Sequence, residues 1–455
     1  MSVSPARAAA FDILLRVERE SSYASDLLHS STHTHLSPAD HALATELAMG
    51  VLRWRSRLDA DIATASSQPL SKLDLEILIA LRLALYQFLW LDRVPQRAAL
   101  HESVELVKRA RKRSAAPFVN AVLRKLSATP HANPTSHETD SPEALARTLA
   151  HPLWLVERWA REYGLSATRQ ICQHNQSIPA TAIRLRIPAA EEEEQLHEEG
   201  ITLAPGGLLA SARRVLSGDI TKTRAFRAGH IVIQDEGSQL VATLVGSTVL
   251  GESSHILDCC AAPGGKTLAI ADHNPSAAIT AVELHPHRAR LLQKLLGKNS
   301  MRLAAQIQVV TADAQHLPIT QKFDRVLADV PCSGTGTLAR NPEIKWRLTA
   351  DDLVELQRRQ LAILHSALAQ VVPLGRLIYS TCSLEKEENE AVVEQALAEK
   401  NSFRLLDCRT ELAHLKESGD LKWPDPASLT RGPYLRTIPG LHPCDGFFAA
   451  IMERF

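Results

Sequence analysis

The C-terminal half of the chain is constrained most strongly by a regular alternation of apolar and amphipathic segments. Apolar runs of strand length stand at residues 255–260, 279–284, 307–311, 323–329 and 375–380. Helical periodicity occupies several of the intervals, as in residues 288–296 and 352–370. Strands that alternate with helices form a parallel sheet covered on both faces. Residues 231–455 are therefore predicted to be a Rossmann-like α/β domain, and the runs 434–438 and 446–452 predict a terminal hairpin.

The N-terminal half has a different pattern and predicts two further parts. Residues 1–127 repeat apolar positions at three- and four-residue spacing, which predicts an all-α domain. Residues 128–142 are rich in Pro, His, Ser and Thr and predict a linker. Residues 143–230 predict a small α+β insert, with helices at 152–163 and 189–199 and strands at 181–187 and 201–203. The chain is thus expected to be multidomain.

Composition excludes several classes of protein. The 455 residues contain 51 Lys+Arg and 51 Asp+Glu, so any contact with nucleic acid requires a local basic patch. No long uncharged apolar run is present, which argues against a membrane span. Seven cysteines without a CxxC pair argue against a disulfide framework or a bound metal. A cytoplasmic monomer is the simplest expectation.

The segment 257–267, LDCCAAPGGKT, predicts a cofactor loop between a strand and a helix. A P-loop would require glycine at Cys260, and the G-x-G-x-x-G pattern of dinucleotide folds is absent. S-adenosylmethionine remains as the candidate cofactor, because it requires an open turn after the first strand and an acid at the end of the second. Glu283 is suitably spaced for the ribose, and Asp313 follows the third strand. Both acids could instead be ordinary strand-end caps.

Two cysteines follow the fourth and fifth strands, in DVPCSGTG (Cys332) and STCS (Cys382). The carboxyl ends of neighbouring strands meet at one edge of a sheet, so both thiols should face the cofactor loop. A thiolate that adds to carbon 6 of a cytosine activates carbon 5 toward a methyl donor, and a nearby carboxyl such as Asp329 can assist at N3. Spacing alone does not tell which thiol attacks. The remaining five cysteines are expected to be small buried side chains.

The motifs LDCCAAPGGKT, DVPCSGTGTLARNPEIKW and YSTCSLEKEENE together resemble the RNA cytosine-C5 methyltransferases of the Nol/Nop/Sun group. The resemblance implies a class I methyltransferase fold and S-adenosylmethionine as cofactor. It implies that Cys382 is the nucleophile, that Cys332 assists product release and that Asp329 activates the base. The residues implied to bind the cofactor are Cys260, Ala261, Ala262, Pro263, Gly264, Gly265, Lys266, Glu283, Asp313 and Asp329. The role of Lys266, toward cofactor or base, stays open.

Two N-terminal segments, ELAMGVLRWRSRLD and APFVNAVLRKL, resemble the helical RNA-binding domain of the NusB family. Such a domain ahead of the methyltransferase is the layout of bacterial enzymes that act on small-subunit (16S) ribosomal RNA. The resemblance therefore implies that this RNA is the substrate. The same chemistry on transfer RNA is one alternative. A non-catalytic RNA-binding factor for ribosome assembly is the other.

Local basic clusters supply candidate contacts to RNA. Residues 1–127 hold 17 Lys+Arg against 13 Asp+Glu, and five cations stand within six residues at KRARKR. A solvated charged helix face remains the alternative for this cluster. Three further cations follow the PCSGTG loop and could hold the target strand. The candidates are Lys108, Arg109, Arg111, Lys112, Arg113, Arg340, Lys345 and Arg347.

Overall fold

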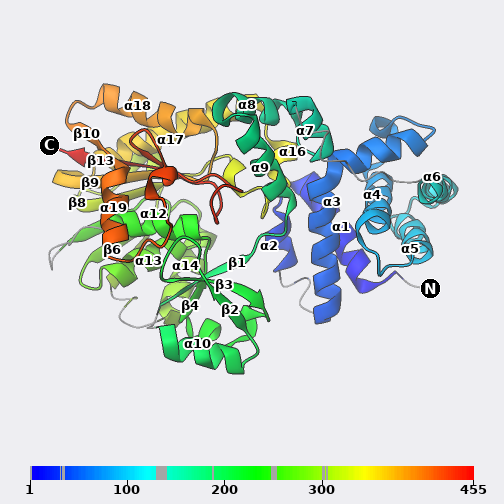
Figure 1. Cartoon of the computed structure of the whole chain (residues 1–455), viewed down its shortest axis with the longest axis horizontal. Coiled ribbons are helices and arrows are strands. Elements are labelled where there is room, and N and C mark those ends of the chain that lie inside the picture. Colours follow the sequence, from blue (N-terminus) through cyan, green and yellow to red (C-terminus); the bar gives the residue numbers. More distant parts are fainter. Residues whose placement is uncertain are drawn as a thin grey trace. The chain divides into compact units, whose positions relative to one another are not determined.

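The computed structural model describes residues 3–30, 32, 36–129, 141–186, 189–246, 254–299, 303 and 306–455 (Figure 1). The predicted linker 128–142 lies almost entirely outside the described residues. Contacts divide the chain into two compact units. The first comprises Met1–Ile178 with Leu338–Arg347, and the second comprises Pro179–Thr337 with Leu348–Phe455. The domain boundaries predicted from the sequence, at residues 127, 142 and 230, stay predictions, because the two units reflect the density of contacts and not domain limits.

The first unit is helical, as predicted for the N-terminal part. Apolar stripes at helical spacing build its core, which includes the buried Phe11, Leu47, Leu81 and Leu123. Proline stands in the first turn of α1 and α3, where a backbone N–H would have no hydrogen-bond partner within the helix, so its absence costs nothing. The main helices are α1 (Pro5–Glu20), α3 (Pro38–Ala65), α4 (Leu75–Trp90), α5 (Gln96–Arg109), α6 (Ala116–Ala128), α7 (Pro142–Thr148), α8 (Leu153–Tyr163), α9 (Leu165–Gln176) and the short α16 (Ile344–Arg347).

The second unit begins with a small antiparallel sheet in the order β2-β3-β1-β4. Its strands are β1 (Thr181–Leu185), β2 (Thr202–Pro205), β3 (Ala212–Ser217) and β4 (Ile231–Ile233). Strands β3 and β4 escaped the sequence analysis, because β3 contains two arginines and β4 is only three residues long. Helices α10 (Ala189–Glu198) and α11 (Arg224–Ala228) complete this part, which has the mixed α+β character expected for the insert. The helix predicted at residues 152–163 (α8) lies instead in the first unit.

The Rossmann-like domain is built on a nine-stranded sheet in the order β11-β12-β13-β9-β8-β5-β6-β7, with β10 paired to β13. Five strands are mutually parallel: β5 (His255–Asp258), β6 (Ala278–Glu283), β7 (Ile307–Thr311), β8 (Phe323–Asp329) and β9 (Val371–Thr381). The strand order reverses at β5, which lies between β6 and β8. Ligands of such sheets bind at this reversal, beyond the carboxyl ends of the strands.

The predicted terminal hairpin is present but belongs to a larger antiparallel extension. Strand β12 (Tyr434–Arg436) pairs with β13 (Phe448–Arg454), and β13 also pairs with β9. Strands β10 (Phe403–Leu406) and β11 (Thr430–Arg431) extend this part further.

Helices cover both faces of the large sheet (Figure 1). One core joins it to α12 (Glu236–Gly246), α13 (Gly265–His273), α14 (Pro286–Asn299) and α19 (Cys408–Glu417). A second core joins the other face to α17 (Ala350–Leu368) and α18 (Glu390–Glu399). None of the described helices combines the length and the apolar character that a membrane crossing requires.

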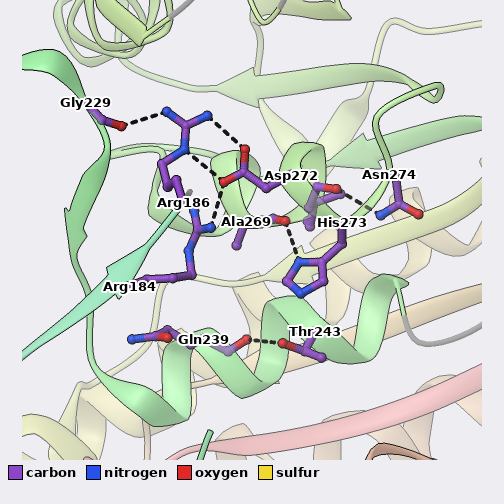
Figure 2. Close-up of polar contacts among 10 residues, drawn as sticks. Arg184, Arg186, Gly229, Gln239, Thr243, Ala269, Asp272, His273 and Asn274 are labelled. Carbon is purple, nitrogen blue, oxygen red and sulfur yellow. Dashed lines mark hydrogen bonds and ion pairs between the residues drawn. The ribbon is translucent and has the colours of Figure 1, made fainter. Parts of the chain in front are cut away.

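Two arginines of the small insert bind one carboxylate of the Rossmann-like domain (Figure 2). Arg184 Nη1 and Arg186 Nε donate to Asp272 Oδ2 over 2.6 and 2.9 Å, and Arg186 Nη2 donates to Oδ1 over 2.8 Å. Burial opposes a charged Asp272, but the two guanidinium groups prevail and lower its pKa. Because Asp272 lies in α13, this contact fixes the helix that begins at the cofactor loop.

Asp272→Ala is expected to lower the free energy of unfolding by about 3 kcal/mol, the usual cost of leaving a buried charge without its partner. Arg184 is 3% exposed, and among the described residues only Asp272 binds its guanidinium. Chemical denaturation measures the change. Glu355→Ala, which removes an exposed pair with Arg358, serves as control and should leave stability nearly unchanged. Equal stabilities of the two variants would contradict the structural role of Asp272.

Candidate active site

The loop after β5, which the sequence predicts to bind the cofactor, is organised by Asp258, the last residue of β5. Its carboxylate accepts hydrogen bonds from Thr267 Oγ1 over 2.7 Å and from the Cys260 N–H over 3.3 Å. Burial raises the pKa of Asp258 to about 6. The sequence analysis did not single out this residue, although a carboxylate between an apolar strand and a glycine-rich turn indicates such a role.

Glycine is required where the loop turns into α13. Gly264 has a φ of +110°, and a Cβ there would lie 2.5 Å from Leu292 Cδ1. Gln234 approaches the next residue, Gly265, and its buried Oε1 receives no hydrogen bond from any described residue. The polar group beside the turn is therefore the Gln234 amide, whose Nε2 would lie 3.4 Å from a Cβ on Gly265.

The two acids predicted to face the cofactor lie at the carboxyl ends of β6 and β7. Glu283 is 5% exposed and accepts a hydrogen bond from the His285 N–H over 2.9 Å. Asp313 caps a short 3-10 helix by accepting from the Gln315 N–H over 2.9 Å. Each acid therefore has a local capping contact, as the alternative interpretation expected. Arg288, which the sequence analysis did not consider, donates to the Ala262 carbonyl of the loop over 3.3 Å.

Asp329 and Lys266 form an ion pair at the centre of the site. Lys266 Nζ lies 2.8 Å from Asp329 Oδ2, and Ser380 Oγ donates to Asp329 Oδ1 over 2.6 Å. Burial favours a neutral lysine, but the attraction of Asp329 prevails and raises the pKa of Lys266. The ammonium also lies 5.1 Å from the centre of the Phe447 ring. In this structure the partner of Lys266 is therefore Asp329.

Cys332 and Cys382 are brought together, with 3.3 Å between their sulfur atoms. The loop after β8 carries Cys332 and the end of β9 carries Cys382, and Gly336 N donates to the Cys382 carbonyl over 2.9 Å. The hydrogen bond that the Cys332 thiol donates to Cys382, together with burial, raises the pKa of Cys332 well above its ordinary value. Gly336 permits this approach, since a Cβ there would lie 2.1 Å from the Gly446 carbonyl oxygen.

The other five cysteines are outside this thiol pair, and burial raises the pKa of each. Cys172, Cys259, Cys408 and Cys444 are buried, and Cys260 is partly exposed. A raised pKa means a neutral thiol at physiological pH, which suits a packing role.

The KRARKR cluster lies on the surface of the helical unit, and part of its charge is already paired. Lys108, Arg109 and Lys112 each form an ion pair with a carboxylate of this unit. Arg111 and Arg113 are exposed and have no carboxylate partner within the described part of the chain. These two guanidinium groups are therefore the most available to phosphate.

Two of the basic residues after the PCSGTG loop, Lys345 and Arg347, have partners within the first unit. Lys345 is 1% exposed and donates to the Arg53 carbonyl over 2.9 Å, and burial lowers its pKa well below the ordinary value. Arg347 donates to the carbonyls of Val17, Ser21 and Ser22. Arg340 also has a polar partner. Backbone carbonyls thus bind Lys345 and Arg347 within the helical unit, and the role of both residues toward RNA stays a prediction.

The raised pKa of Asp258 leads to a specific prediction for how stability depends on pH. Its pKa is about 6 in the folded chain and about 4 when unfolded, so it stabilises the fold fully below pH 4. This contribution, on the order of 2 to 3 kcal/mol, is lost as pH rises through about 6. Asp258→Asn should therefore gain stability relative to the parent between about pH 4 and 6, and then level off. Denaturation at a series of pH values tests this, with the exposed Asp92→Asn as control. A difference that stays constant with pH would contradict the assignment.

Comparisons with known proteins agree with this architecture. A family model described as 16S rRNA methyltransferase RsmB/F matches residues 249–453, the NusB family model matches residues 4–128, and the ferredoxin-like domain of RsmF/B-like methyltransferases matches residues 151–217. The crystal structure of PH0851 superposes with a TM-score of 0.80 at 24% identity and covers all of both chains. The structure of NSun6 from Pyrococcus horikoshii has a TM-score of 0.55 at 19% identity over 66% of this chain and 97% of its own.

Curated relatives match along the whole chain. A protein of Bacillus subtilis named probable ribosomal RNA small subunit methyltransferase B is 32% identical over 100% of both chains. The ribosomal RNA small subunit methyltransferase B of Vibrio cholerae is 30% identical over 98% of this chain and 97% of its own. With its NusB segment, its ferredoxin-like insert and its methyltransferase domain, this chain belongs to the RsmB/F family of 16S rRNA methyltransferases.

Proposed function

We propose that this protein transfers a methyl group from S-adenosylmethionine to carbon 5 of a cytosine in small-subunit (16S) ribosomal RNA, in the cytoplasm. The observation that carries the proposal is the pair of thiols, Cys332 and Cys382, whose sulfur atoms lie 3.3 Å apart. Ser380 links this pair to the Asp329–Lys266 ion pair, because it stands two residues before Cys382 and donates to Asp329. The names of the relatives support ribosomal RNA as the substrate.

The loop after β5 and the acids after β6 and β7 would hold the cofactor. S-adenosylmethionine supplies an electrophilic methyl group on a sulfonium. The tight turn at Gly264 lets a ligand approach the backbone, and the amide of Gln234 lies beside the next residue, Gly265. Glu283 has a carboxylate suited to two vicinal hydroxyls. Asp313 would lie on the adenine side, and the loop 260–266 would line the rest of the pocket.

The resemblance of the STCS motif assigns the role of nucleophile to Cys382, and the contacts of the thiol pair suit that role. The raised pKa of Cys332 keeps a proton on that sulfur. The Cys332 thiol can then donate toward a Cys382 thiolate, and Lys266 supplies a positive charge near it, because a negative Cys382 raises the Lys266 pKa. The Cys382 thiolate would add to carbon 6 of the cytosine and form a carbon–sulfur bond. The displaced π electrons make carbon 5 nucleophilic.

Asp329 is suited to stabilise the activated base. Its carboxylate is held by Lys266 and Ser380, so its orientation does not depend on the substrate. A cytosine adduct that carries a proton at N3 presents two adjacent donors, the N3–H and the exocyclic amino group. A fixed carboxylate can accept hydrogen bonds from both, which favours that form of the base.

Release of the product requires removal of the proton from carbon 5. The electrons of that C–H bond restore the 5,6 double bond while the bond between carbon 6 and the Cys382 sulfur breaks. Once Cys382 is a thioether it carries no negative charge and accepts a hydrogen bond from the Cys332 thiol only weakly. One cause of the raised Cys332 pKa is then removed, so Cys332 can act as base or position one.

The helical domain is proposed to bind the RNA backbone through its basic cluster, with Arg111 and Arg113 as principal contacts. Their exposed guanidinium groups lack carboxylate partners within the described residues. Phosphate contacts of this kind position a substrate without reading its sequence.

Methyl transfer tests the proposal together with its alternatives. The parent should transfer label from S-adenosylmethionine to unmodified 16S RNA, and Cys382→Ala should transfer none. Cys332→Ala should accumulate a protein–RNA adduct that survives denaturation, because release is blocked. Cys408→Ala, which removes a buried thiol elsewhere, should still transfer.

Other outcomes separate the alternatives. Exchange of the two phenotypes would reverse the roles of the thiols. Label found only in transfer RNA would overturn the substrate, and no transfer with retained RNA binding would support an assembly factor.

The double variant Arg111→Ala/Arg113→Ala should bind a 16S RNA fragment roughly tenfold more weakly, because two phosphate contacts are lost. The slope of affinity against salt should fall by about one for each lost contact. Filter binding over a salt series measures both quantities. Arg16→Ala removes an exposed arginine of α1 that is paired with Glu20, and should change neither. The role of the cluster is refuted if the double variant has the same affinity and the same salt slope as Arg16→Ala.

A further inference from the structure

The carboxylate of Glu388 is completely buried and lies between the two cysteine loops, outside the residues that the proposed chemistry uses. Its Oε1 accepts hydrogen bonds from the Ser333 N–H over 2.8 Å and from Gln360 Nε2 over 2.9 Å. Its Oε2 accepts hydrogen bonds from the hydroxyls of Ser333 and Ser383. Each carboxylate oxygen thus has two donors, which satisfies the carboxylate fully.

The two serines bound by Glu388 are the residues that directly follow the two cysteines. Ser333 follows Cys332 in the loop after β8, and Ser383 follows Cys382 after β9. The serine hydroxyls lie 3.1 Å from each other. The Glu388 carboxylate therefore binds the serine of both Cys-Ser segments. It thereby holds the two cysteine-bearing segments at a fixed distance from each other.

Glu388 is itself held in place by its surroundings. The Tyr379 hydroxyl donates to the Glu388 carbonyl over 2.6 Å. Gln360 donates to the Pro331 carbonyl as well as to Glu388, each over 2.9 Å. The adjacent Asn389 donates from Nδ2 to the Ser383 carbonyl over 2.9 Å. Because these partners come from β9, α17 and both loops, the carboxylate has little freedom to move.

We propose that Glu388 is a positioning residue that sets the separation between the sulfur atoms of Cys332 and Cys382. The effect of this separation on catalysis rests on the proposed function, in which one thiol must reach the adduct formed by the other. Without the carboxylate, four buried donors would lose their acceptor, and the loops would shift to find new ones. A shift of about 1 Å at reacting groups can lower a rate roughly 100-fold.

The separation of the thiols can be measured without RNA or cofactor. Phenylarsine oxide is captured by two nearby thiols: two sulfur–arsenic bonds form and one molecule of water leaves. Intact-mass spectrometry and a titration would give the affinity of the folded full-length protein for this probe. Cys332→Ala and Cys382→Ala identify the capture that depends on this pair.

Glu388→Ala should weaken capture of the arsenical roughly tenfold, because the effective concentration of one thiol at the other falls. Its kcat should drop about 100-fold while KM for S-adenosylmethionine stays near that of the parent. Glu388→Gln keeps an acceptor for the Ser333 N–H, and the hydroxyls of Ser333 and Ser383 can rotate to accept hydrogen bonds from its amide. Most of the affinity for the arsenical and most of kcat should therefore return. Glu394→Ala, an exposed glutamate of α18, is the matched control and should resemble the parent.

The proposal is overturned if a folded Glu388→Ala variant captures the arsenical as tightly as the parent. It is also overturned if Glu388→Gln is as defective as Glu388→Ala, since rescue by the amide is what positioning requires. Should Glu388→Ala fail to fold, Ser333→Ala removes one hydroxyl donor and must weaken capture as well. If the parent methylates no RNA but Glu388 still controls capture, the proposed function fails while the positioning role stands.

Discussion

The ion pair between Lys266 and Asp329 connects the parts of the active site. Lys266 stands in the first turn of α13, and Asp329 ends β8. Ser380 of β9 binds the other oxygen of the same carboxylate. The ends of three adjacent strands, β5 through α13, β8 and β9, are thereby held together in a largely buried place, where charges attract more strongly than in water. The predicted cofactor loop and the thiol pair are consequently linked through this ion pair.

Buried carboxylates recur as the organising element around this site. Asp258 holds the cofactor loop, and Asp272 fixes the far end of the same helix to the small sheet. Glu388 binds both cysteine loops. Each of these acids accepts hydrogen bonds from two or more groups, so removing one acid leaves several buried donors without a partner. The proposed positioning of the thiol pair thus relies on a residue outside the groups that are proposed to react.

Much of this architecture follows from local sequence, and the rest depends on contacts between distant residues. The strand–helix alternation predicts the five parallel strands, and the two thiols meet because parallel strands end at one edge. Strand β10 was missed because its partner β13 lies about 50 residues away, beyond any local pattern. Lys345 looks like a surface cation in the sequence, but its partner is the carbonyl of Arg53, 292 residues earlier. Glu388 stands in an acidic run typical of solvated surface, and only the fold reveals its burial.

The identity of the sulfur bonded to the target base tests the account most directly. A 16S RNA fragment containing 5-fluorocytidine would trap the adduct, because carbon 5 then lacks the proton that must leave. Digestion and mass spectrometry of the trapped complex would identify the linked peptide. The account predicts that carbon 6 is bonded to Cys382 and that Cys332 remains a free thiol. A bond to Cys332, or no adduct with a protein that binds both RNA and cofactor, would contradict it.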